Sequence, residues 1–111
     1  MKTLSFKREY IPLLLSGEKR STVRRLYRKY RVGEEVLLTA GKGDFKAIAR
    51  IRRIVVKKLG DLSEEDISKE GVKDKESLVK TLKKYYRNRV DEGTRIQILY
   101  FDILKYLHGE G

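Results

Sequence analysis

The sequence predicts a single α+β domain in which a curved or closed, barrel-like β-sheet is flanked by helices. The chain has 111 residues, the length of one ordinary domain. Its apolar periodicity predicts the order strand, helix, strand, strand, helix, helix, strand, with connections of modest length. In the longest predicted strand the alternation slips at Arg52 and Arg53, which is typical of a β-bulge that bends a sheet towards a barrel.

The first two predicted elements are a strand over Lys2–Lys7 and a short helix over Tyr10–Ser16. In the strand, apolar residues alternate with polar neighbours. In the helix, Pro12 stands in the first turn, where its missing N–H does no harm. Gly17 follows the apolar run and is a natural C-terminal stop.

The middle of the chain predicts a β-hairpin. A turn at Val32–Glu34 leads into a strand over Glu35–Ala40, and Ala40–Asp44 carries the glycine and aspartate residues of a tight connection. A long strand over Phe45–Val56 follows. Its alternation predicts one apolar face, formed by Phe45, Ala47, Ala49 and Ile51.

Two helices are predicted next. The sequence Ser63–Asp66 resembles a capping box, with Leu62 and Ile67 placed to form a hydrophobic staple. Gly71 is expected to end this helix. A longer amphipathic helix is expected over Asp74–Asn88, capped by its first residue.

The last predicted strand covers Arg95–Leu104 and is apolar on both faces, so it should lie inside the sheet rather than at its edge. We expect Lys105–Gly111 to be a flexible tail. The single domain should therefore span residues 1–104, because no repeat or linker indicates a second one.

Composition excludes several kinds of site. There is no Cys, and so no disulfide, thiolate zinc site or Cys nucleophile, and the single His108 offers little for a metal site or a Ser-His triad. We expect no metal and no cofactor. Met1–Phe6 is too polar for a signal peptide, and the longest apolar run, Ile11–Leu15, is far shorter than the ~20 residues of a membrane span. We expect a cytoplasmic monomer with no membrane partner.

The charge is unusual. Charged residues make up 39% of the chain, against a typical ~25%, and the net charge is +11. Abundant Lys, Arg and Glu with one Asn and one Gln is the composition of proteins from hot environments. Surface ion pairs would balance Lys with Glu, however, so the positive excess favours a polyanionic partner, RNA or a nucleotide.

The most informative segment is Gly17–Arg24, which fits G-x-K-x-x-T-x-R without a gap directly after the first predicted helix. It is followed by a turn into a strand, a long strand with an isoleucine-rich end, a Leu-x-x-Glu-Asp helix start, a Glu-Gly pair and a Phe-containing apolar strand. These segments are Val32–Val36, Ala47–Val56, Leu62–Asp66, Glu70–Gly71 and Ile98–Leu104. In this order, over residues 2 to about 104, the chain resembles the ASCH family of the PUA-like superfamily.

The resemblance implies a PUA-like β-barrel with a cleft lined by the Lys-x-x-Thr-x-Arg segment, and a role in handling RNA or nucleotides. One branch of the family consists of small amidohydrolases that deacylate N-acetylated cytidine with a Lys, a Thr and a Glu. These residues fall on Lys19, Thr22 and Glu70. Arg20 departs from the pattern of that branch, where a small residue is more usual.

The residues themselves set a geometric condition on that chemistry. If this segment is extended, Arg20, Thr22 and Arg24 share one face, and only a turn or bulge brings Lys19 to Thr22. A threonine hydroxyl becomes a nucleophile when a base takes its proton, and a lysine can do so if nearby cations lower its pKa. Glu70 could then protonate a leaving amine or orient water.

The next stretch, Arg24–Arg31, alternates cations with tyrosines. Cations can neutralise phosphates and tyrosine rings can stack on bases. Alternatively Leu26 and Tyr30, four residues apart, form the apolar side of a helix whose cations are solvated. The candidate nucleic-acid-binding residues of the two segments are Lys19, Arg20, Thr22, Arg24, Arg25, Tyr27, Arg28, Lys29 and Arg31.

Three functions follow. The leading hypothesis is an RNA- or nucleotide-binding module, and basic faces at Arg50–Arg53 and Lys80–Arg89 support it if they lie beside the cleft. The second is an amidohydrolase acting on an acylated nucleoside through Lys19, Thr22 and Glu70. The third is a protein-interaction domain whose charge serves only solubility.

Overall fold

The computed structural model describes residues 1–26, 28–69, 75–86 and 91–108. Five strands form one mixed sheet in the order β1-β3-β4-β5-β2. They are β1 (Thr3–Phe6), β2 (Ser21–Arg25), β3 (Glu35–Ala40), β4 (Phe45–Lys58) and β5 (Arg95–His108). β1 pairs with β3 in parallel and the other neighbours are antiparallel.

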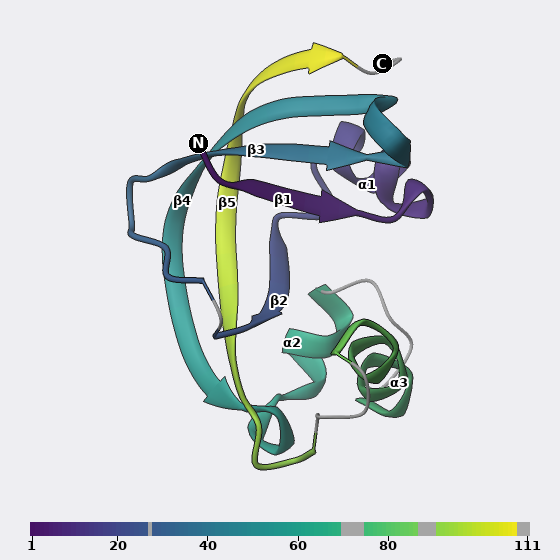
Figure 1. The fold of residues 1–111 in the computed structure, drawn as a ribbon, viewed down its shortest axis with the longest axis vertical. Coiled ribbons are helices and arrows are strands. Elements are labelled where there is room, and N and C mark those ends of the chain that lie inside the picture. Colours follow the sequence, from purple (N-terminus) through teal and green to yellow (C-terminus); the bar gives the residue numbers. More distant parts are fainter. Residues whose placement is uncertain (27, 70–74, 87–90, 109–111) are drawn as a thin grey trace.

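The predicted α+β class is confirmed, whereas closure of the barrel is not. β4 and β5 run the length of the molecule and curve strongly, which turns β1 and β2 towards each other (Figure 1). These two edge strands are not paired by their backbones. A side chain crosses between them instead, because Nη2 of Arg24 donates to the carbonyl of Ser5 at 2.7 Å.

Helices lie at both ends of the long strands (Figure 1). The helix α1 (Ile11–Ser16), preceded by the 3-10 turn η1 (Arg8–Tyr10), lies near β1 and β3, and α2 (Glu64–Lys69) and α3 (Lys75–Tyr86) lie at the opposite end. α1 carries Pro in its first turn and ends at Gly17, whose φ of 81° is the left-handed conformation that glycine adopts without strain. Both features were predicted.

The predicted hairpin and bulge are also confirmed. β3 and β4 pair from Ala40 and Phe45 outward, across the 3-10 turn η2 (Gly41–Gly43). The pairing of β4 with β5 shifts register between Ile51 and Arg53, which leaves Arg52 as the extra residue. The alternate residues Phe45, Ala47, Ala49 and Ile51 are all fully buried.

The core has two parts. The first fills the concave side of the sheet and includes Leu4, Leu14, Leu38, Phe45, Leu99 and Phe101. The second lies under α2 and α3 and includes Val23, Leu59, Leu62, Ile67, Leu78, Leu82 and Ile98. β5 is shared by both parts, since alternate residues face opposite sides, and this explains its apolar composition on both faces.

The capping box at the start of α2 is formed as predicted. The Asp66 N–H donates to Ser63 Oγ at 3.1 Å, and the Ser63 N–H donates to Asp66 Oδ2 at 3.0 Å. Leu62 and Ile67 are both buried in the second core. The expected helix stop at Gly71 and cap at Asp74 lie outside the described residues.

Three expectations need correction. The predicted element order lacked β2, because Ser21, Thr22 and Val23 are all buried and show no alternation. The predicted tail from Lys105 is wrong up to His108, since these residues pair with Ile48, Ala47 and Lys46 of β4. The helix suggested by Leu26 and Tyr30 is absent from the described part of this segment, where Tyr30 packs against the first core from a loop.

Candidate functional site

Buried polar side chains of the described residues gather around β2. They are Lys19 (2% exposed), Ser21 (3%), Thr22 (2%) and Gln97 (2%). Thr22 and Gln97 lie on the neighbouring strands β2 and β5, and Lys19 lies directly before β2. Burying polar and charged groups is costly unless each has a partner. Their concentration beside β2 therefore marks the candidate site.

Lys19 is held by the end of α1 and by two aromatic rings. Its N–H donates to the carbonyl of Leu13 at 3.0 Å. Its Nζ lies 4.8 Å from the centre of the Tyr10 ring and 5.7 Å from that of Phe6, distances at which a ring face attracts a cation. β2 begins only at Ser21, so the alternation of that strand does not fix the direction of Lys19. Its side chain points to the rings of Phe6 and Tyr10.

Thr22 and Arg24 occupy the same face of β2, as an extended segment requires. Nε of Arg24 donates to Oγ1 of Thr22 at 3.0 Å, and its guanidinium lies 5.1 Å from the Phe6 ring centre. Lys19 and Arg24 thus both lie against Phe6, although Lys19 precedes the first residue of β2. The guanidinium of Arg24 is engaged on two sides, because it also donates to the carbonyl of Ser5.

Two hollows open beside these residues. The first, of about 230 Å³, is lined by Gly17, Lys19, Arg20, Phe101, Asp102, Ile103 and Tyr106. The second, of about 240 Å³, lies between the edge strands and is lined by Thr3, Leu4, Ser5, Arg24, Arg25, Arg28 and Tyr30. Both are smaller than the roughly 300–1,000 Å³ pockets of drug-sized ligands, so each has room for a small chemical group rather than a large molecule.

Arg20 and Asp102 form polar parts of the first hollow. The Arg20 side chain is exposed, and its Nε donates to the carbonyl of Gly17 at 2.7 Å. Asp102 lies 3.5 Å from Nε of Arg52, the residue of the β-bulge. Of the predicted basic face Arg50–Arg53, Arg52 is therefore paired with a residue that lines the first hollow.

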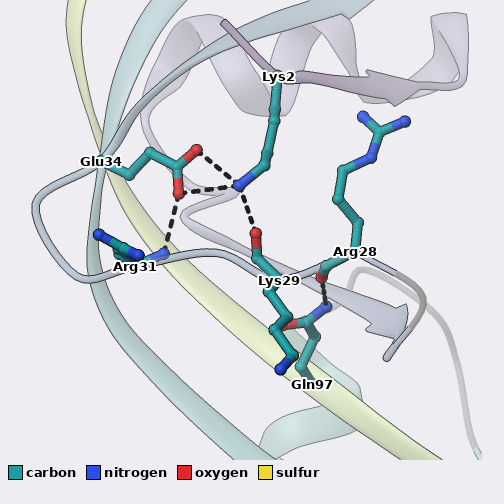
Figure 2. Close-up of polar contacts among 6 residues, drawn as sticks. All are labelled: Lys2, Arg28, Lys29, Arg31, Glu34 and Gln97. Atoms are coloured by element: carbon teal, nitrogen blue, oxygen red, sulfur yellow. Dashed lines mark hydrogen bonds and ion pairs between the residues drawn. The ribbon is translucent and has the colours of Figure 1, made fainter.

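The loop after β2 is fixed by two buried or half-buried side chains from distant parts of the chain (Figure 2). The amide of Gln97 donates to the carbonyls of Arg25 at 3.2 Å and Arg28 at 2.8 Å. Nζ of Lys2 donates to the carbonyl of Lys29 and pairs with Glu34 at 3.0 Å. These contacts hold the described residues of this loop, which form no helix or strand.

Glu34 completes the same network. Its Oε1 accepts a hydrogen bond from the Arg31 N–H at 2.9 Å (Figure 2). The hydrogen bond from Lys2 is the main cause that lowers the pKa of Glu34; burial opposes it, and Arg31 adds to it. Glu34 is therefore ionised at neutral pH and neutralises Lys2.

The structure distributes the predicted site residues over several places. Lys19 and Arg24 lie against Phe6, Thr22 accepts from Arg24, and Arg24, Arg25 and Arg28 line the second hollow. Lys29 contributes its carbonyl and Arg31 its N–H to the loop network, while Arg20 lines the first hollow. Tyr27 and Glu70 lie outside the described residues.

Sequence reasoning missed Phe6, Tyr10 and Gln97. The aromatic pair was indistinguishable from ordinary core residues. Gln97 carried a usable signal, since it is the sole Gln of the chain and interrupts an apolar strand. A polar residue in such a strand needs a buried partner, and here it has two.

Other kinds of site find little support in the described part of the chain. No three His, Asp or Glu side chains there lie close enough together to hold a metal ion. None of its helices combines the length and apolarity needed to cross a membrane.

The fold and a family match relate the chain to known proteins. A protein from Enterococcus faecalis V583 superposes with a TM-score of 0.82 at 16% identity, over 96% of this chain and 77% of that one. An ASCH domain from Lactobacillus crispatus JV V101 gives 0.69 at 20% identity, over 95% and 80%. An ASCH protein from Zymomonas mobilis gives 0.61 at 14% identity, over 96% and 71%.

Among curated proteins, none matches the chain. The family model for the ASCH domain matches residues 2–97, most of the sequence. Its matched segment contains β1 to β4, the Lys-x-x-Thr-x-Arg segment and the start of β5. The chain therefore belongs to the ASCH domain family, which is PUA-like.

Proposed function

We propose that this protein is an RNA- or nucleotide-binding ASCH module whose binding surface is the wall formed by β2 and the loop that follows it. The observation that carries the proposal is the gathering of buried Lys19, Thr22 and Gln97 with a row of arginines on this wall. Cations beside hollows of nucleotide-fragment size suit a phosphorylated ligand.

A protein-interaction domain whose charge serves only solubility would explain fewer of these observations. A charge that served only a protein-interaction domain would be distributed over exposed positions, where each ion pair contributes little. It would give no reason for a Lys that is 2% exposed or for a Thr hydroxyl that accepts from an Arg inside the sheet. The positive excess of +11 would in addition attract polyanions from a distance.

A salt titration tests the proposal. Binding of a labelled single-stranded RNA of about twelve nucleotides is measured by fluorescence anisotropy between about 50 and 200 mM salt. For three or four phosphate contacts to a single strand, affinity should fall roughly twentyfold to fiftyfold over this range. Salt-independent binding, or no binding to any RNA by the folded protein, would contradict it.

A pair of single-charge variants makes the test specific. Arg20→Gln removes an exposed cation from the first hollow, and Lys46→Gln removes an exposed cation from the start of β4. We expect Arg20→Gln to weaken binding several-fold and Lys46→Gln to leave it nearly unchanged. Equal losses would indicate attraction to the whole surface rather than to this site.

A second candidate function is deacylation of an N-acylated nucleoside of the cytidine type. It is favoured by the hydrogen bond from Arg24 to Thr22 Oγ1, because a cationic donor stabilises the alkoxide that a nucleophilic threonine would form. Lys19 would be the base for that hydroxyl, and Glu70 would protonate the leaving amine.

This candidate is tested by incubating the protein with N-acetylcytidine and following the release of cytidine. Thr22→Ala should abolish turnover, whereas Thr39→Ala, a half-buried threonine on β3 that lines neither hollow, should not. If the folded wild-type protein releases no cytidine, the hydrolase function is excluded for this substrate and binding remains.

A further inference from the structure

The β-bulge in β4 brings two consecutive arginines to one face of the sheet. In a regular strand Arg52 and Arg53 would point to opposite faces. The register of β4 against β5 shifts at this point, however, and the guanidinium carbons of Arg52 and Arg53 lie 5.7 Å and 5.3 Å from the centre of the Tyr100 ring. Both residues are exposed. The bulge has therefore re-aimed a side chain, which is how bulges serve neighbouring sites.

Tyr100 defines the face on which this arginine pair lies. It is the ladder partner of Arg53, is 8% exposed and belongs to the second core. Its neighbours Leu99 and Phe101 belong to the first core, so the arginine pair stands on the opposite face of the sheet. An aromatic ring attracts cations at these distances but leaves their N–H donors to oxygen acceptors. Tyr100 thus provides a common platform for both cations.

The arginine pair keeps donors for an acceptor from outside the chain. Within the described residues, Arg53 has no carboxylate at ion-pair distance, and its contact is the Tyr100 ring. Nε of Arg52 lies 3.5 Å from Oδ1 of Asp102, and the two side chains are 47% and 57% exposed. An ion pair so open to water contributes little to stability, so an incoming anion can compete with it.

Asp102 connects the arginine pair to the candidate site. Its side chain pairs with Arg52, and it lines the first hollow together with Arg20. The N–H of Phe101, the residue before it, donates to the carbonyl of Arg20 at 2.9 Å. Three consecutive residues of β5, Tyr100 to Asp102, therefore lie between the two places. A nucleic-acid strand with one nucleotide at the first hollow can present a neighbouring phosphate to the arginine pair.

We propose that the arginine pair binds one phosphate group of an RNA backbone, on the face of the sheet opposite the first core. The proposal rests on the RNA-binding function proposed above and adds a contact beyond the wall formed by β2. A guanidinium presents a planar fork of donors that matches the oxygens of a phosphate. Continuity with the first hollow favours RNA over an acidic protein segment, which is the competing ligand for a basic face.

The test compares two double variants that each remove two neighbouring exposed cations. Arg52→Gln with Arg53→Gln removes the arginine pair, and Lys83→Gln with Lys84→Gln removes two exposed lysines of α3. The net charge falls by two in both. Because all four residues are exposed, both variants should fold like the wild type, and thermal unfolding checks this.

The slope of log affinity against log salt is measured for each protein with single-stranded RNA of about twelve nucleotides. Loss of the arginine pair removes one phosphate contact and should make the slope shallower by about 0.7, whereas loss of the lysine pair should leave it unchanged. Arg52→Lys with Arg53→Lys keeps the charge and should retain the slope with a several-fold weaker affinity, because lysine has no planar fork of donors.

The failure of this contact differs from the failure of RNA binding. Equal slopes for the two glutamine variants, while Arg20→Gln still weakens binding, would overturn the contact and leave the proposed function standing. If the arginine pair is needed for binding an oligoglutamate peptide but not RNA, the face belongs to an acidic protein and the proposal is wrong.

Inorganic tripolyphosphate tests the anion site if the wild-type protein binds no RNA. It is titrated while the backbone amide signals of residues 50–54 and 99–102 are followed by NMR. Shifts in these signals that the Arg52→Gln/Arg53→Gln variant lacks would support the phosphate site although the RNA function had failed. No such shifts would overturn the site as well.

Discussion

The two edge strands of the sheet differ in what their side chains contact. β1 buries one of its four residues, Leu4, whereas β2 buries its first three, Ser21, Thr22 and Val23. β2 is covered on one face by α2 and α3 through Val23 and faces β1 across the hollow with the other. An edge strand enclosed in this way can carry polar groups into the interior, provided that each finds a partner.

The largest loss of stability is expected at Leu4, the single buried residue of β1. Leu4→Ala removes the apolar contact of β1 with the first core and should lower the free energy of unfolding by about 2–5 kcal/mol. Ser5→Ala on the same strand is exposed and serves as the control. Urea unfolding measures both, and similar small losses would show that β1 is held by its pairing with β3.

The polar anchoring of the segment after β2 is tested by Gln97→Leu. Similar volume is kept, but the carbonyls of Arg25 and Arg28 lose their donor, which should cost about 1–3 kcal/mol. Amide hydrogen exchange in residues 28–34 should accelerate relative to β3. Unchanged stability and exchange would mean that the loop is fixed by Lys2 and Glu34 alone.

The helix α2, which covers the other face of β2, is tested by Asp66→Asn. Burial acts to raise the pKa of Asp66, but hydrogen bonds from Lys57 and Ser63 outweigh it and lower the pKa. The substitution removes the charge that pairs with Lys57 at 2.8 Å and weakens the helix cap, at a cost of about 1 kcal/mol. Glu64→Gln, exposed in the same turn, should cost less in thermal unfolding.

The smallest effect is a pH dependence of the loop network. Because the pKa of Glu34 is lower in the folded protein than in the unfolded chain, its contribution to stability is complete above the ordinary value of 4.5. That contribution disappears as the pH falls through the lowered pKa. Glu34→Gln should therefore flatten the decline of stability below about pH 4.5, and an unchanged decline would assign it to other carboxylates.

Local signals predicted most of the fold. The glycine stop at Gly17, the hairpin at Ala40–Asp44, the bulge at Arg52 and the capping box at Ser63 each depend on neighbouring residues and were predictable. β2 was not assigned as an element, because burial on both faces removes the alternation by which an edge strand is recognised.

The sequence indicated which residues belong to the candidate site, but not how their side chains are arranged. The motif indicated Lys19, Thr22 and Arg24, but not that Arg24 would be tied to Thr22 and Ser5. The hydrogen bond to Ser5 joins residues 19 positions apart across two strands that are not paired. Sequence periodicity describes single elements, so it carries no information on such a crossing.

The Arg24 crossing also governs how the molecule meets other copies of itself. Strand edges with free N–H and C=O groups are templates on which a further strand can add, and this is a common start of aggregation. Here the two edges face each other, and a guanidinium occupies the Ser5 carbonyl between them. An intruding strand would have to displace that cation from its hydrogen bonds. The same arginine that donates to Thr22 thereby leaves one carbonyl fewer on the β1 edge for an added strand to pair with.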